Sequence, residues 1–154
     1  ALGRVLRLLV AIDGSKQAAH AANWAGRMAP YLGETSIELF SVQPAFSPFE
    51  GMLDAAAGDF HHWGQALGEA AIKATREQMG IAGHRATASV ATGDTLPMIL
   101  ARADAVGANV IVVAPHGANV LEQAVLGSVS QSLLQAAPCP VLIVPRNMDI
   151  DDPN

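Results

Sequence analysis

The chain alternates between short apolar runs and longer segments in which apolar residues recur at helical spacing. Valine, isoleucine and leucine dominate the runs, and a continuous β-branched run is typical of a strand buried on both faces of a sheet. Polar and glycine-containing stretches separate the runs. The pattern predicts strands over residues 5–12, 37–42, 86–90, 111–113 and 141–144.

The first two helices are predicted from an apolar stripe and from the residues that flank it. Ser15 is a candidate N-cap, and Gly33 is the glycine at which we expect the first helix to end. A longer helix is predicted over residues 59–79, because Gly80 follows it. The stripe of the first helix comprises Ala18, Ala21, Ala22, Ala25, Met28, Ala29 and Leu32.

Two further helices are predicted from their start signals. Thr95 is a candidate N-cap with Pro97 in the first turn, where a missing N–H has no cost, and this helix should end near Gly107. Ser128 followed three residues later by Gln131 has the pattern of a capping box at the start of another helix.

The alternation of strands and helices in 154 residues predicts one α/β domain. We expect a Rossmann-like, five-stranded parallel sheet with helices on both faces and the strand order 3-2-1-4-5, because crossovers between parallel strands are right-handed. The ordered core should span about residues 4–146, before an acidic tail at 147–154. Hydrophobic residues make up 51% and charged residues 15%, a composition that excludes a disordered chain.

Charge and composition narrow the class of partner. A net charge of −5 with nine scattered Lys and Arg residues argues against nucleic-acid binding, which needs a clustered basic surface. No apolar run reaches the roughly 18 residues of a membrane-spanning helix, and the N-terminal residues do not have the pattern of a signal peptide. We therefore expect a cytoplasmic protein without a membrane partner. Cys139, the single cysteine, is expected to be a small buried residue rather than a redox group.

The candidate site lies where two loops should meet. In a doubly wound sheet, ligands bind outside the carboxyl ends of the strands where the strand order reverses, which brings residues 11–15 beside residues 114–127. The second loop leads into the helix at Ser128, and unpaired N–H groups at a helix N-terminus bind phosphate oxygens. Gly117 and Gly127 would let the backbone approach a ligand closely.

Asp13 should lie at the mouth of this crevice. Its carboxylate can accept a hydrogen bond from the exocyclic amine of adenine or from a ribose hydroxyl. The alternative is a turn residue that only supports Gly14 and Ser15 at the start of the first helix.

The spacing of these motifs resembles the nucleotide-binding members of the universal stress protein family. Gly117 is followed by nine residues, then Gly127-Ser128, and then APCPVLIV at 137–144. The family has Gly-x-x-Gly at the start of this pattern, and here Ala114 stands at the first glycine. LLVAIDGS at 8–15 and Gly93-Asp94 extend the resemblance over nearly all of the chain except about residues 44–58.

The resemblance implies a stress-response regulator that binds an adenine nucleotide, ATP, ADP or AMP, with Mg²⁺ accompanying ATP. It implies that Asp13 and the backbone of Val42 face adenine. His116 either hydrogen-bonds a ribose or phosphate or is an exposed loop residue without a role. By resemblance Gly117, Gly127, Ser128 and Val129 line the phosphates, and Ala11, Ala114 and His116 complete the predicted site.

Catalytic motifs are missing from the sequence. The phosphate-loop signature, Gly-x-Gly-x-x-Gly and Gly-x-Ser-x-Gly are all absent. The predicted phosphate loop has no general base or acidic metal cluster, so we expect no enzymatic turnover, with slow ATP hydrolysis as a weaker alternative. His61 and His62 are adjacent and would point to different sides of a helix, so we expect no metal site.

Three residues depart from the family pattern and favour a second hypothesis. The Ala114 methyl narrows the site, Pro115 lacks an amide donor, and Glu122 adds a negative charge that should disfavour a longer phosphate tail. The alternative is a dimeric interaction protein of the same fold that does not bind nucleotide. Residues 43–58 would then form its partner surface, whereas in a nucleotide-binding protein they could form a lid over adenine.

The last predicted strand, residues 141–144, is apolar and uncharged and should lie at an edge of the sheet. Such an edge favours pairing with another chain. We therefore expect a homodimer in which two copies of this strand pair antiparallel, and the family resemblance implies the same contact. The alternative is that the acidic tail covers the edge.

Overall fold

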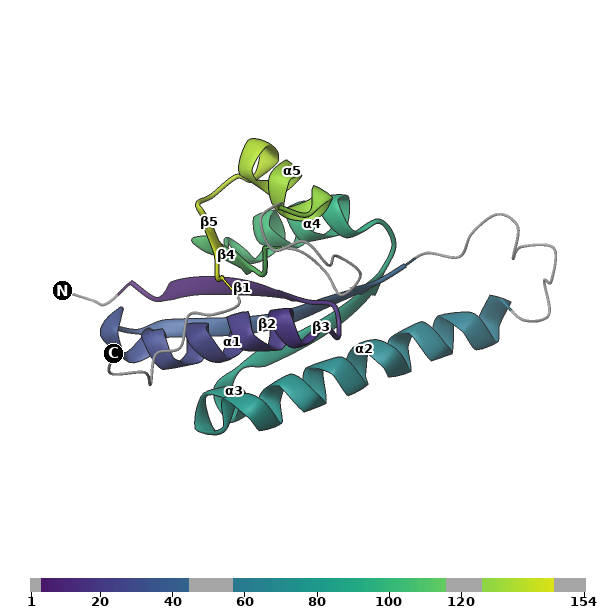
Figure 1. Ribbon diagram of the computed structural model, residues 1–154, viewed down its shortest axis with the longest axis horizontal. Helices are drawn as coiled ribbons and strands as arrows, with labels where there is room; N and C mark the ends of the chain where they lie inside the picture. The colour runs from purple at the N-terminus through teal and green to yellow at the C-terminus, as the bar shows by residue number, and fades with distance from the viewer. Residues whose placement is uncertain (1–3, 45–56, 116–125, 146–154) are drawn as a thin grey trace.

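The structure is a computed structural model, which describes residues 4–44, 57–115 and 126–145 (Figure 1). Its strands are β1 (Leu6–Ile12), β2 (Thr35–Gln43), β3 (Thr87–Thr92), β4 (Val110–Val113) and β5 (Val141–Ile143). Its helices are α1 (Lys16–Met28), the short 3-10 helix η1 (Ala29–Tyr31), α2 (Ala57–Met79), α3 (Ile81–Arg85), α4 (Thr95–Val106) and α5 (Ser128–Ala136).

The strands form one parallel sheet in the order β3-β2-β1-β4-β5, which confirms the predicted fold class and strand order. β1 lies at the centre, with Leu8 opposite Ile37 of β2 and Val110 of β4. The order reverses between β1 and β4, because the chain first builds outward to β3 and then returns to the other side of β1. β3 and β5 are the edge strands.

Helices cover both faces of the sheet (Figure 1): α1, α2 and α3 lie on one face, and α4 and α5 lie on the other. Alternate residues of each strand supply the two cores, as the period of a strand requires. Leu8 and Val10 of β1 pack toward α1 and α2, whereas Leu9 between them packs toward α4 and α5 with Ile99 and Leu133.

The helix boundaries correct several of the predicted caps. Ser15 is an N-cap, and its Oγ accepts a hydrogen bond from the Ala18 N–H at 3.1 Å. Ser128 is not: the N-cap of α5 is Gly127, whose extended backbone places Ser128 inside the first turn, and the capping box does not form. The prediction for Thr95 was wrong for the same reason, since Asp94 is the N-cap of α4.

Some of the predicted helix C-termini are confirmed and one is wrong. Gly107 ends α4 in the left-handed conformation with φ of 63°, and Gly80 follows α2 with φ of 64°. Gly33 does not cap the first helix, because the chain tightens into η1 at Ala29 before it reaches Gly33. The sequence prediction also missed α3, which begins directly after Gly80.

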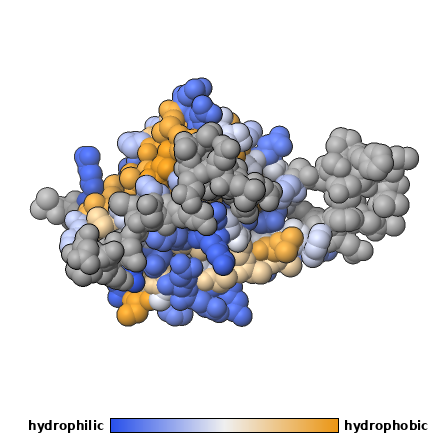
Figure 2. Space-filling model, viewed as in Figure 1, coloured by the Kyte–Doolittle hydropathy of each residue, from blue (hydrophilic) through white to orange (hydrophobic). Residues whose placement is uncertain are grey.

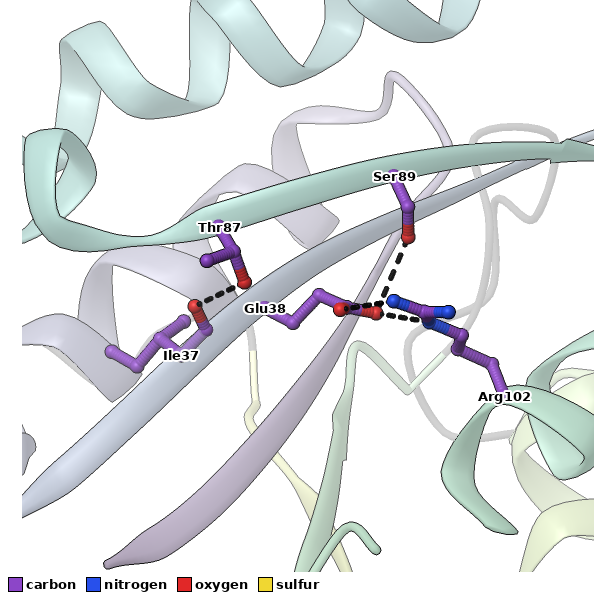
Figure 3. A network of polar contacts seen from close by, with 5 residues as sticks. All are labelled: Ile37, Glu38, Thr87, Ser89 and Arg102. Carbon is purple, nitrogen blue, oxygen red and sulfur yellow. Dashed lines mark hydrogen bonds and ion pairs between the residues drawn. The ribbon is translucent and has the colours of Figure 1, made fainter. Parts of the chain in front are cut away.

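A polar network ties α4 to the sheet (Figure 3). The Arg102 guanidinium of α4 donates from Nε and Nη2 to the two carboxylate oxygens of Glu38 on β2, both at 2.7 Å. Ser89 of β3 donates to the same carboxylate at 3.2 Å. The hydrogen bonds and charge of Glu38 raise the pKa of Arg102 against the opposing effect of burial, so the guanidinium stays charged at neutral pH.

Candidate functional site

A cavity of about 270 Å³ opens at the carboxyl ends of β1, β2 and β4, between the N-termini of α4 and α5. It lies where the strand order reverses, which is the place that the sequence predicted. The predicted site residues that line the cavity are Ala11, Asp13, Val42, Ala114, Gly127, Ser128 and Val129. Two other predicted site residues, His116 and Gly117, lie outside the described residues, as does Glu122.

The sequence prediction missed the apolar walls of this cavity. Phe40 and Ile99 line it and are 3% and 1% exposed, and Val113 is buried beside them. Phe40 could have been found from Val42, because residues two apart in a strand face the same side. Ile12, Ala18, Thr95 and Ser130 are the other lining residues that the sequence prediction did not include.

Asp13 has the turn role that the sequence left as its alternative, and its contact with a ligand stays a prediction. Its Oδ1 accepts a hydrogen bond from the Ser15 N–H at 2.9 Å, which closes the turn after β1 around Gly14, with φ of 86°. The same carboxylate lines the cavity. Asp13 is also the one charged side chain among the described residues that line it, so the described part of the wall holds no cation for a phosphate.

The N-terminus of α5 supplies backbone donors instead. The first intrahelical bond runs from the Gln131 N–H to the Gly127 carbonyl at 3.0 Å, so the N–H groups of Ser128, Val129 and Ser130 have no partner within the helix. No acidic residue lies in this first turn. A turn of this kind binds anions, because its N–H groups and the helix dipole both favour negative charge.

Two hydrogen bonds fix this N-terminus to the end of β4. The Ser130 hydroxyl donates to the Ala114 carbonyl at 2.8 Å, and the Gly127 N–H donates to the Pro115 carbonyl at 2.8 Å. Ser130 is 4% exposed, so its hydrogen bond is shielded from water. Gly127 has φ of −65° and ψ of 161°, angles that any residue adopts, so glycine is not required there by the backbone. Its missing side chain instead leaves room at the cavity wall.

α4 presents a different N-terminus to the same cavity. Thr95, its first residue, is half-buried and lines the cavity, and Ile99 follows one turn later on the same face. Pro97 has no N–H, and Asp94 at the N-cap adds a carboxylate to this end of the helix. The first turn of α4 is therefore a weaker anion site than that of α5.

The described residues contain neither a cluster of metal ligands nor a membrane-spanning helix. Among them no group of three or more His, Cys, Asp or Glu side chains could hold a metal ion. No helix in the described ranges is both long and apolar enough to cross a membrane. Cys139 is half-buried, and burial raises the pKa of its thiol against the effect of a backbone hydrogen bond at Ile111. A thiol of raised pKa is a poor nucleophile at neutral pH, as expected for a packing residue.

The parallel sheet and the cavity at its switch point define a doubly wound fold of the α/β class. Residues 5–145 match the model of the universal stress protein family, so the chain belongs to this family. Universal stress protein YxiE of Bacillus subtilis (strain 168) is 30% identical over 148 residues, which cover 90% of this chain and 97% of the relative.

Solved structures share the fold. Universal stress protein UspA from Lactobacillus plantarum aligns with a TM-score of 0.79 at 19% identity, over 92% of this chain and 99% of its own. A universal stress protein family protein from Arabidopsis thaliana, solved with AMP bound, aligns with a TM-score of 0.65 at 22% identity, over 94% of each chain. Two further structures of the fold are complexes with cAMP and dAMP, at TM-scores of 0.65 and 0.53.

Proposed function

We propose that this universal stress protein binds an adenine nucleotide, AMP, ADP or ATP, in the cavity between α4 and α5. The observation that carries the proposal is the first turn of α5, where Ser128, Val129 and Ser130 bring unpaired backbone donors to the wall of a cavity whose other lining residues are mostly apolar. A nucleotide has the matching chemistry, because its phosphate needs donors and its base needs apolar surface.

The relatives of known structure support the same ligand class. The three complexes named above hold AMP, cAMP and dAMP, which are adenine nucleotides with a single phosphate. AMP is therefore the first ligand to test. Mg²⁺ would accompany ATP, because a triphosphate tail carries more charge than the α5 N-terminus offsets.

The orientation of the nucleotide follows from the two ends of the cavity. The phosphate would lie on the first turn of α5, since the first turn of α4 has a carboxylate at Asp94 and lacks a donor at Pro97. The base would then lie toward β2, against Phe40 and Val42. Asp13 is left near the sugar, where its carboxylate can accept from a ribose hydroxyl.

We propose that the bound nucleotide regulates rather than turns over. Phosphoryl transfer needs groups that neutralise the charge developing on the phosphoryl oxygens. The described residues of the cavity offer backbone N–H groups and one carboxylate, Asp13, but no cationic side chain. Incubation with ATP should therefore release inorganic phosphate slowly or not at all, and rapid release would favour the ATPase alternative.

Calorimetry on protein stripped of bound ligand tests nucleotide binding. AMP should give a saturable heat with one site per chain, and ribose alone should give none. No heat with AMP, ADP or ATP at millimolar concentration would contradict the proposal. That result would favour the alternative of a dimeric interaction protein, whose partner surface at residues 43–58 falls largely outside the described residues.

We further propose that the protein is a homodimer joined through β5. This strand is at the edge of the sheet, and Leu142 on it is 38% exposed. Figure 2 shows hydrophobic residues gathered on the side of the molecule where α5 and β5 lie. A cavity of about 330 Å³, lined by apolar residues including Trp24, Leu32 and Leu142, lies beside the same edge. An apolar edge of this kind favours pairing with a second copy.

Leu142→Lys is the substitution that tests this contact. Ile143 is less suitable, because it packs into the core on the α4 and α5 face, and its replacement would damage the protomer. Leu142→Lys should sediment as a monomer at micromolar concentration while the wild type sediments as a dimer, since a lysine would lie unpaired in the strand pair. Leu67→Lys, on the exposed surface of α2, is the control. A monomeric wild type would contradict the proposed interface.

A further inference from the structure

Thr95 is the residue with a side-chain hydroxyl that α4 contributes to the lining of the cavity. The residue is half-buried, lines the cavity, and lies in the first turn of α4. Within the described residues no hydrogen bond engages its hydroxyl, whereas the Ser130 hydroxyl of α5 donates to the Ala114 carbonyl. A hydroxyl without a protein partner, on a residue that lines a cavity, is available to a ligand.

The surroundings of Thr95 suit the base of a nucleotide rather than its phosphate. Phe40 and Ile99 form an apolar wall beside it, and both are almost fully buried. The Asp94 carboxylate precedes it in the chain, and like charge near a phosphate is unfavourable. A flat aromatic base can pack on apolar side chains and direct a polar edge to one hydroxyl.

The Glu38–Arg102 pair fixes the position of this hydroxyl. Thr95, Ile99 and Arg102 are four and three residues apart, so they lie along one face of α4. At the far end of this face, Arg102 binds both carboxylate oxygens of Glu38 on β2, and Ser89 of β3 holds the same carboxylate (Figure 3). A bidentate pair restricts orientation as well as distance, so α4 has little freedom to shift Thr95 along the cavity.

We propose that the Thr95 hydroxyl accepts a hydrogen bond from the exocyclic amine of adenine and so contributes to the choice of base. The proposal rests on nucleotide binding in this cavity, with the phosphate on α5. With the phosphate there and the ribose between, the edge of the base farthest from the sugar reaches toward α4. In adenine that edge carries the amine, which is a donor, and a threonine hydroxyl is an acceptor.

The test compares AMP with purine riboside 5′-monophosphate, which is the same nucleotide without the amine. Thr95→Val removes the hydroxyl and keeps the shape of the side chain. It should weaken AMP about fivefold, the size of one neutral hydrogen bond, and leave the affinity for purine riboside 5′-monophosphate unchanged. Thr95→Ser, which keeps a hydroxyl, should restore AMP binding. Thr92→Val is the matched control, because Thr92 ends β3 and does not line the cavity.

Each outcome decides the proposal. A Thr95→Val variant that binds AMP as tightly as the wild type would overturn the proposed role of Thr95. An equal loss for both nucleotides would also overturn it, because the hydroxyl would then contact another part of the ligand or support the fold. Thermal unfolding of each variant separates a contact with another part of the ligand, which leaves Tm unchanged, from a role in the fold, which lowers it. A wild type that binds neither nucleotide would refute nucleotide binding itself. If the wild type binds both nucleotides and Thr95→Val changes its affinity for AMP and for purine riboside 5′-monophosphate equally, only the role of Thr95 is refuted.

Discussion

The N-termini of α5 and α4 reach the same cavity, but they differ in charge and in the backbone donors that they offer. α5 begins at Gly127 with N–H groups on Ser128, Val129 and Ser130 and no acid in the turn. α4 begins at Asp94 and loses a donor at its third residue, Pro97. Helix geometry alone does not make an anion site, and under the proposed function we expect the residues of the first turn to direct the phosphate to α5.

The two helices are also held to the sheet by different contacts. The start of α5 is fixed by a shielded, neutral hydrogen bond from Ser130 to the Ala114 carbonyl. α4 is fixed two turns after Thr95 by the ion pair of Arg102 with Glu38, in which the arginine side chain is 36% exposed. Disturbing the first contact should affect the phosphate end directly, whereas disturbing the second should affect the base end through the position of α4.

The largest expected effect is that of Gly127→Val. The backbone angles of Gly127 suit any residue, so the variant should fold, but its side chain would fill space where the phosphate approaches α5. AMP affinity should fall by more than about 100-fold, on the scale of losing several charge-assisted hydrogen bonds. Calorimetry measures the loss, and circular dichroism checks the fold. Wild-type affinity in a folded variant would show that the phosphate does not lie at α5.

Ser130→Ala should have an intermediate effect. It removes the bond to the Ala114 carbonyl and leaves that half-buried acceptor without its partner, which should cost about 1 kcal/mol of unfolding free energy. AMP should also weaken a few-fold, because the first turn of α5 is less firmly placed. Denaturant unfolding and calorimetry give the two values. Ser132→Ala is the control, because Ser132 lies two residues after Ser130 in α5 and is not among the cavity residues. A stability loss with unchanged AMP affinity would confine Ser130 to a structural role.

Arg102→Met should have the smallest effect. The pair is partly exposed to solvent, so its loss should cost about 0.5–1 kcal/mol of unfolding free energy, and Tm should fall by only a few degrees. AMP should weaken no more than about twofold, and purine riboside 5′-monophosphate should not respond. A fall in AMP affinity as large as that of Gly127→Val would contradict the assignment of α4 to the base end.

The strands and their order could be predicted because long apolar runs alternate with amphipathic segments, and few topologies satisfy the crossover rule. The position of Gly127 and Ser128 at the cavity could be predicted because they stand in a recognisable pattern, and their contact with a phosphate stays a prediction. The N-caps of α5 and α4 were placed one residue too late, at Ser128 and Thr95. The residue type alone does not give the backbone angles that separate an N-cap from the first helical residue.

The wall of the cavity formed by β2 and α4 was missed for a different reason. Phe40, Ile99 and Thr95 come from β2 and from two turns of α4, and no local motif in the sequence joins them. They meet only because α4 crosses back over the sheet after β3, which is a consequence of the whole topology. The Glu38–Arg102 pair is likewise formed by residues that are far apart in the chain.

The most direct test of the account is an NMR titration of ligand-free protein, in which backbone amide signals are followed as AMP and then adenosine are added. The account predicts that AMP shifts the amides of Ser128, Val129 and Ser130 in a saturable way. Adenosine, which lacks the phosphate, should leave those amides nearly unmoved and should shift residues near Val42 and Thr95. No saturable shift with AMP, or equal shifts at α5 with AMP and adenosine, would contradict the placement of the phosphate on α5.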